Sequence, residues 1–191
     1  MLRVMLVDDS QEEVSLLKEG LVAAGYDVVV VSGPGLALAE RVSEVQPDVI
    51  IIDTESPTRD VLEHVAVVSA CNPRPIVLFT EDRANATIQA AVKAGVSAYV
   101  VAGIQAERLQ PILEVAVARF EREQALREEL RDVQTKLAAR KVIERAKGIL
   151  MQQKGVSEEE AFRLLRKLAM DRNARLLDVA QSVLDVTSLL G

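Results

Sequence analysis

The sequence is poor in aromatic residues, has one cysteine and contains no long apolar run. Aromatic side chains make up 3% of its 191 residues and hydrophobic ones 49%, so any core must be aliphatic. Cys71 alone can form neither a disulfide framework nor a cysteine-ligated metal cluster. No apolar stretch approaches the roughly 18 residues that cross a bilayer. The opening stretch MLRVMLVDD turns acidic too soon for a signal peptide. We therefore expect a soluble, cytoplasmic protein.

Histidine is as scarce as cysteine, which limits the chemistry that the chain can perform. His64 is the only histidine, and no nucleophile stands beside an evident base. His64 falls within a predicted helix, where a surface or packing role is expected. We predict that the protein is not an enzyme.

Charge is unevenly distributed along the chain. Residues 136–191 carry 11 Lys and Arg against 7 Asp and Glu, a net charge of +4. Residues 1–135 carry the other 12 basic and 22 acidic residues, a net charge of −10. An acidic front and a basic tail predict two roles, with the tail able to approach a polyanion. Ordinary surface variation is the alternative.

The first hundred residues alternate short β-branched runs with amphipathic stretches. Continuous apolar runs of this kind indicate strands that are buried on both faces of a sheet. Five strand–helix repeats predict a doubly wound, flavodoxin-like α/β fold with a parallel five-stranded sheet in residues 1–120. The expected strands are 3–7, 27–31, 48–52, 75–79 and 98–101, and the expected helices are 11–24, 35–45, 58–70 and 83–94.

Aspartates end two of the predicted strands. Asp8 and Asp9 close the first strand, and Asp53 closes the third. In an open parallel sheet, ligands bind at the carboxyl ends of the strands. Clustered carboxylates repel one another unless a cation lies among them, and oxygen ligands of this kind suit Mg²⁺. The sequence therefore predicts a magnesium site at this edge, with Thr80 of the fourth strand beside it.

From about Gln105 the pattern becomes one long helix with charged residues between apolar ones. Within residues 121–140, apolar positions follow the 4-3-4 spacing of a coiled-coil seam, which predicts that two chains pair as a homodimer. A solvated linker helix packed on its own domain is the alternative. The seam residues are Leu126, Leu130, Val133 and Leu137.

The tail, residues 136–191, is predicted to be a small all-α domain of three helices. The first continues the linker helix to about Gln153. Ser157 and Glu160 have the spacing of a capping box and predict the start of the second helix. The stretch DRNAR interrupts the pattern, and the third helix covers 176–190. A domain of this size is marginal alone, so we expect it to depend on the coiled coil.

Basic residues line the predicted tail helices. Rows of Arg and Lys on a helical surface suit phosphate backbones, although many such rows are only solvated faces. Phe162 is the only aromatic residue of the tail and takes an apolar position, so stacking of bases on aromatic rings is not expected. The candidate RNA-binding residues are Lys141, Arg145, Lys147, Arg163, Arg166, Lys167, Arg172 and Arg175.

The strand-end motifs VDD and IID, with a hydroxyl on strand four and an aromatic on strand five, resemble the receiver domain of bacterial response regulators. The resemblance implies that Asp53 is the phosphoacceptor. It also implies that Asp8 and Asp9, together with Asp53 and the backbone carbonyl of Glu55, hold Mg²⁺.

Thr80 and Tyr99 match the residues that act as the switch in that family. The family also has a lysine just after strand five, where this sequence has Ala102 in VVAGIQ. Without that lysine the phosphoryl group loses one charge-assisted contact. We therefore predict that Asp53 is phosphorylated only conditionally and that phosphorylation is not the main input.

The tail phrases IERAKGILM, GVSEEEAFRLLRKLAM and LLDVAQSVL resemble the ANTAR output domain of the AmiR and NasR antitermination regulators, over nearly all of residues 136–186. The resemblance implies an RNA-binding transcription antiterminator that binds leader-RNA stem-loops. SPTRDVLEH and GVSAYVV are most similar to nitrate-responsive antiterminators of the NasT type. That similarity implies a role in nitrate or nitrite assimilation and control by a sequestering, NasS-like nitrate-binding sensor protein.

Two other functions stay open on the sequence. A phosphorylation-driven, DNA-binding response regulator is weakened by Ala102 and by a tail without a clear helix-turn-helix pattern. A protein-interaction adaptor would use the acidic front and the coiled coil alone, and it predicts no salt-sensitive RNA binding.

Overall fold

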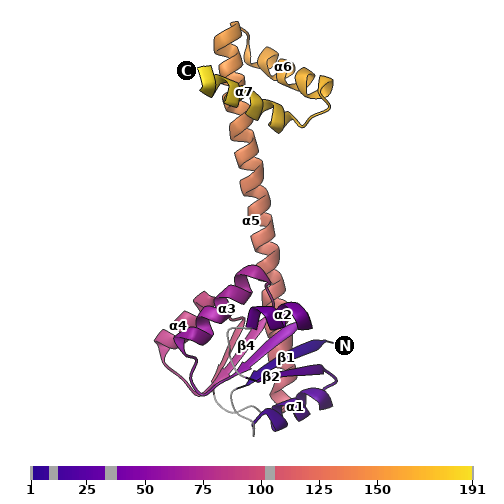
Figure 1. Ribbon diagram of the computed structural model, residues 1–191, viewed down its shortest axis with the longest axis vertical. Helices are drawn as coiled ribbons and strands as arrows, with labels where there is room; N and C mark the ends of the chain where they lie inside the picture. Colours follow the sequence, from indigo (N-terminus) through magenta and orange to yellow (C-terminus); the bar gives the residue numbers. More distant parts are fainter. Residues whose placement is uncertain (1, 9–12, 33–37, 102–105, 191) are drawn as a thin grey trace. The chain divides into compact units, whose positions relative to one another are not determined.

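The computed structural model describes residues 2–8, 13–32, 38–101 and 106–190 (Figure 1). The chain divides into two compact units, Met1–Gln124 and Ala125–Gly191. Helix α5, Ala106–Lys154, contributes its first turns to the first unit and the rest to the second. Within the described ranges, no helix combines the length and the apolar character needed to cross a membrane.

A parallel five-stranded sheet forms the centre of the first unit (Figure 1). Its strand order is β2-β1-β3-β4-β5, which confirms the doubly wound, flavodoxin-like fold predicted from the sequence. Each strand begins and ends within one residue of its predicted bounds, because the β-branched runs are short and sharply delimited. The strands are β1 Arg3–Asp8, β2 Asp27–Ser32, β3 Val49–Asp53, β4 Ile76–Thr80 and β5 Ala98–Val101.

Helices cover both faces of this sheet, and alternate residues of β1 show the two cores. Met5 and Val7 pack in the core that α2, α3 and α4 close, whereas Val4 and Leu6 pack in the core that α1 and the first turns of α5 close. Central strands therefore carry apolar side chains on both sides, as predicted. The helices are α1 Glu13–Ala23, α2 Leu38–Val45, α3 Arg59–Cys71 and α4 Asn85–Ala94.

Gly95 ends α4 and directs the chain into β5. Its φ of +101° lies in the left-handed region, which glycine adopts without the steric cost of a Cβ. A Cβ built at this position would lie 2.5 Å from Ser69 Oγ of α3. The glycine thus permits the close approach of α3 and the turn that brings Tyr99 onto the sheet.

Three helices form the second unit: the later turns of α5, then α6, Glu158–Asp171, and α7, Leu176–Leu190. The predicted capping box is confirmed, since the Ser157 hydroxyl accepts from the Glu160 N–H and the Glu160 carboxylate accepts from the Ser157 N–H. The core is small and mostly aliphatic, with Ala146, Leu165, Ala169, Val179 and Ala180 buried at its centre.

Candidate receiver pocket and nucleic-acid interface

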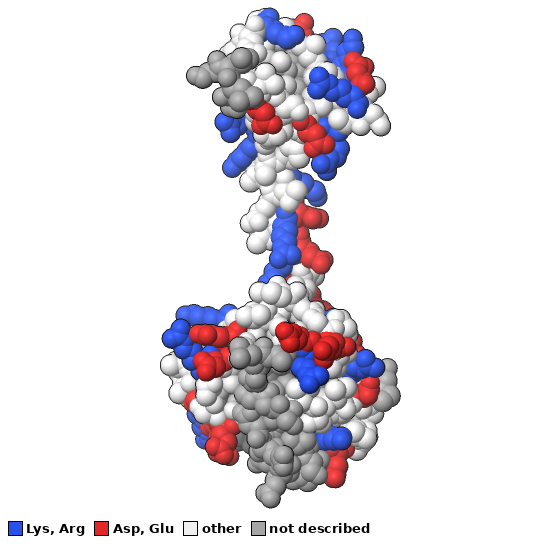
Figure 2. Space-filling view, in the orientation of Figure 1, with Lys and Arg blue, Asp and Glu red and all other residues white. Residues whose placement is uncertain are grey.

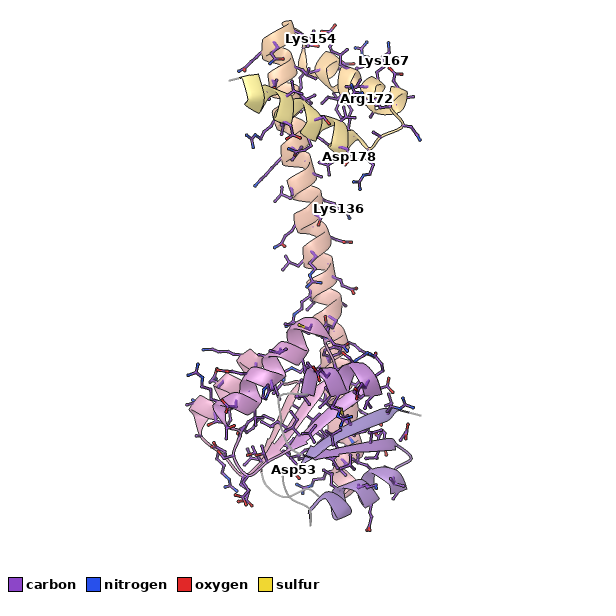
Figure 3. All side chains as sticks on the ribbon, viewed as in Figure 1. Asp53, Lys136, Lys154, Lys167, Arg172 and Asp178 are labelled. Carbon is purple, nitrogen blue, oxygen red and sulfur yellow. The ribbon has the colours of Figure 1, made fainter. Side chains whose placement is uncertain are left out.

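The carboxyl edge of the sheet brings two of the predicted acidic positions together. Strands β1 and β3 are hydrogen-bonded neighbours, and Asp8 is paired in register with Asp53. Asp53 is half-buried at this edge (Figure 3). For Asp8 only the backbone position is described, and Asp9 and Ala102 lie outside the described residues. The backbone therefore supports convergence of Asp8 and Asp53 at one edge, as an oxygen-ligand site for Mg²⁺ would require.

The carbonyl of Glu55, expected as a metal ligand, is engaged in hydrogen bonds. The buried Thr80 hydroxyl donates to it at 2.8 Å, and the Glu81 N–H donates at 3.2 Å. A carbonyl oxygen has two lone pairs, and both face donors here. A metal at this oxygen would compete with these two donors, and the role of the Glu55 carbonyl as a ligand stays a prediction.

Asp82, which the sequence reasoning missed, organises the loop between β4 and α4. Its carboxylate accepts from the Ala84 N–H at 2.7 Å, from Thr87 Oγ1 at 3.0 Å and from Ser56 Oγ at 3.2 Å. The bond from the Ala84 N–H, followed by that from Thr87, holds the pKa of this carboxyl below its usual value. An aspartate just before a predicted helix was the available signal, because such residues accept from helix N-terminal amides.

The backbone of Asp82 connects the two predicted switch residues. Its N–H donates to Thr80 Oγ1 at 3.2 Å, and its carbonyl accepts from the Tyr99 hydroxyl at 2.9 Å. Partial burial, and then the charge of Asp82, raise the pKa of the Tyr99 phenol above its usual value. Thr80 and Tyr99 therefore lie in one hydrogen-bonded network, with Asp82 between them.

The second unit presents its basic side chains on exposed helix surfaces (Figure 2). On α6 the apolar positions face the core, while Arg163, Arg166 and Lys167 are exposed on the opposite side. Most of the other candidates are also exposed, although Arg175 is paired with Asp178 through two hydrogen bonds of 2.9 and 3.0 Å. The exposed candidates are Lys141, Arg145, Arg163, Arg166, Lys167, Arg172 and Arg175, of which Figure 3 labels Lys167 and Arg172.

Lys147 does not fit the predicted role of an RNA contact. Its side chain is only 10% exposed, and its ammonium donates to Glu144 at 2.8 Å and to Glu158 at 2.7 Å. Those two carboxylates raise the pKa of Lys147 above its usual value. Since Glu158 lies at the start of α6, the lysine joins α5 to α6. We therefore reassign Lys147 from phosphate binding to the support of α6.

Phe162 takes an apolar position on α6, from which stacking of bases was not expected. In the structure 41% of the residue is exposed to solvent. The core-facing places are taken by Ala161, Leu165 and Ala169, which leaves Phe162 at the border between the core and the basic side. A ring that is exposed at this border is accessible to a ligand.

The predicted coiled-coil seam is exposed along its length. Leu126, Leu130, Val133 and Leu137 are 57, 57, 55 and 52% exposed. The described residues of the second unit therefore leave this seam uncovered. A row of exposed aliphatic side chains on one helix is the surface that a partner helix covers.

Comparisons with known proteins identify both parts of the chain. The family model for the response regulator receiver domain matches residues 4–114, and the model for the ANTAR domain matches residues 131–184. Transcriptional regulatory protein PdtaR of Mycobacterium tuberculosis is 33% identical over 183 residues, which cover 96% of this chain and 89% of that protein. The nitrate regulatory protein of Klebsiella oxytoca is 42% identical over 66 residues, covering 35% of this chain and 17% of that protein.

Solved structures agree on the fold of the first unit. The chemotaxis response regulator CheY4 of Vibrio cholerae superposes with a TM-score of 0.53 and is 27% identical. The match covers 61% of this chain and 98% of that chain.

Proposed function

Because this chain belongs to the response regulators that carry an ANTAR output domain, we propose that it is a transcription antiterminator. It is a regulatory protein and not an enzyme. In this proposal, the tail unit binds stem-loops of a leader RNA and so prevents formation of a terminator. The observation that carries the proposal is the exposed basic side of α6 within a matched ANTAR domain.

The basic side of α6 suits an RNA backbone for electrostatic reasons. Arg163, Arg166 and Lys167 lie within five residues, so their charges act on neighbouring phosphates. The ion pair of Arg163 with Glu159 is long, 3.8 Å, and both side chains are well exposed, so it holds the arginine only weakly. Lys141 and Arg145, one helical turn apart on α5, are the next contacts.

Dimerisation through the seam would place two tail units on one RNA. The second stem-loop then binds at a high effective concentration, so two weak contacts give one tight complex. The exposed seam residues of α5 support this arrangement.

The receiver unit would supply the regulation. Asp8, Asp9 and Asp53 are the residues that would hold Mg²⁺, which would offset their charge and that of a phosphoryl group. The sequence has Ala102 where receivers have a lysine, so we propose conditional phosphorylation and control by a sequestering, NasS-like nitrate-binding sensor. The similarity to the nitrate regulatory protein supports a role in nitrate or nitrite assimilation.

Replacing Arg166 with alanine tests the RNA-binding proposal. The full chain is titrated with the leader RNA of the operon next to its gene, over a series of salt concentrations. Arg166→Ala should weaken binding, and the slope of log K against log salt should fall by about one unit, because one phosphate contact is lost. Arg83→Ala, at an exposed arginine of the receiver unit, is the matched control and should change neither quantity.

Three results would contradict the proposal. Unchanged affinity and slope in Arg166→Ala would remove the basic side of α6 from the interface. Preference for duplex DNA over the stem-loop would favour a DNA-binding response regulator. Absence of salt-sensitive RNA binding by the unaltered chain would favour a protein-interaction adaptor.

A further inference from the structure

Helix α6 carries a row of exposed residues that its core packing does not explain. Phe162, Arg166 and Met170 are spaced four residues apart, so they lie above one another on one side of the helix, about 6 Å apart along its axis. Phe162 is 41% exposed and Met170 73% exposed. Large apolar side chains at such exposures mark a binding surface when they lie together.

One face of the Phe162 ring lies near the ammonium of Lys147. The ammonium of Lys147 lies over the ring at 6.0 Å from its centroid, at the outer limit of a cation–π contact. Lys147 is itself fixed by Glu144 and by Glu158, and Glu158 lies one turn before Phe162 on α6. This weak contact favours one orientation of the ring before any ligand arrives, which lowers the entropic cost of stacking against it.

The neighbours of the row indicate which ligand it fits. Arg166 lies within the row, and Arg163 and Lys167 lie beside it. Aromatic rings, Met and Arg also occur in protein–protein interfaces, but Lys is depleted there. Three cations within five residues give this surface a charge that suits a polyanion. An exposed aromatic ring next to guanidinium groups is a surface on which unpaired RNA bases stack while cations hold the backbone.

We propose that Phe162 is a stacking platform for an unpaired base of the RNA loop, with Met170 extending the apolar part of the row, Arg166 holding the adjacent phosphate and Lys147 positioning the ring. The proposal rests on the RNA-binding function above and adds to it a residue that distinguishes a loop from a stem. The basic residues then supply affinity for the backbone, and Phe162 supplies the dependence on loop bases.

Two hairpin probes test this role in the full chain. The first is a synthetic RNA hairpin selected from a randomised-loop pool by binding to the unaltered protein. The second has the same stem and backbone but abasic loop positions. Phe162→Leu keeps an apolar side chain and removes the flat ring. It should bind the first hairpin about 5- to 150-fold more weakly, the range of one lost base stack. It should bind the abasic hairpin as the unaltered chain does.

Three further variants separate stacking from folding and from charge. Phe162→Tyr keeps the ring and should restore binding of the first hairpin. Leu164→Ala removes a residue of matched exposure, 40%, from another side of α6 and should leave both affinities unchanged. The salt slope should stay constant in Phe162→Leu, because no phosphate contact is lost, whereas it falls in Arg166→Ala.

Each contrary outcome identifies what failed. If Phe162→Leu lost affinity equally for both hairpins, the stacking role would be overturned and the ring would be assigned to folding. Unchanged affinity of Phe162→Leu for the first hairpin would overturn it as well and leave the antiterminator proposal standing, with the row then a protein contact. An unaltered chain that selects no hairpin from the pool would overturn the proposed function itself, and the stacking role with it.

Discussion

Replacing Leu130 with alanine should weaken self-association of this chain without weakening its helix. Leu130 is 57% exposed and is one of four seam residues that remain more than half exposed in the described chain. Alanine favours the helix at least as well as leucine. A loss of dimer in Leu130→Ala would therefore report lost contact between chains and not an unfolded helix.

The free energy that the seam contributes to dimerisation follows from the part of its side chains that is exposed in the single chain. Full burial of a Val or Leu side chain stabilises by about 1.5–3 kcal/mol, so burying the exposed half contributes about 0.8–1.6 kcal/mol. Eight such side chains meet when two copies of the seam pair, which gives about 6–13 kcal/mol. Association itself costs about 4–15 kcal/mol. The seam alone should thus give a weak, concentration-dependent dimer.

Leu130→Ala removes most of one contribution from each copy, about 1–3 kcal/mol in the pair. The dissociation constant should rise about 5- to 150-fold. Thr135→Ala is the matched control, since Thr135 is exposed on the side of α5 that the seam spacing turns away from the partner.

Sedimentation velocity over a concentration series of the full chain measures the dissociation constant of the dimer directly. The unaltered chain and Thr135→Ala should share one monomer–dimer midpoint, and Leu130→Ala should require a higher concentration. A Leu130→Ala chain that dimerises as well as the unaltered chain would show that the seam is not the dimer contact. Equal weakening by Thr135→Ala would show this too, because the effect would then not belong to the seam.

Two predictions concern the receiver unit. Gly95→Ala should lower the melting temperature of this unit more than Gly25→Ala does. Both glycines have a positive φ, but of the two only Gly95 would bring the added Cβ against another side chain, that of Ser69. Equal shifts of the two melting temperatures in thermal denaturation would contradict this expectation. Asp82→Asn should make unfolding less dependent on acid pH. The folded pKa of Asp82 is lowered, so its stabilisation is present above the ordinary aspartate pKa, about 3.9, and is lost as pH falls through the lower folded value. Denaturant titrations from neutral to acid pH measure the difference, and identical pH profiles would contradict it.

The fold of the first unit was predictable because each strand carries a local signal. DVIII and PIVLF are bounded by turn residues and buried on both faces, so their bounds could be placed within a residue. The capping box at Ser157 was predictable for the same reason, since both partners lie within three residues. Signals confined to one turn or one strand do not depend on the rest of the chain.

The roles of Lys147 and Phe162 were not predictable in this way. Lys147 is a basic residue in a basic tail, and only the approach of α6 brings Glu158 to its ammonium. Phe162 lies one position from Ala161, and its exposure depends on where the core of α5, α6 and α7 ends. Composition and periodicity assign a helix face, but they do not give the width of the surface that a neighbouring helix covers.

The sequence by itself determined the sheet order, the family and the position of Asp53, because these follow from local hydrophobic patterns and short motifs. Only the tertiary structure decided which polar groups find partners. It paired Lys147 with two carboxylates and directed the hydroxyls of Thr80 and Tyr99 to backbone carbonyls. Hydrogen bonds and ion pairs depend on distances of a few ångströms between residues far apart in the chain, and those distances are set by packing.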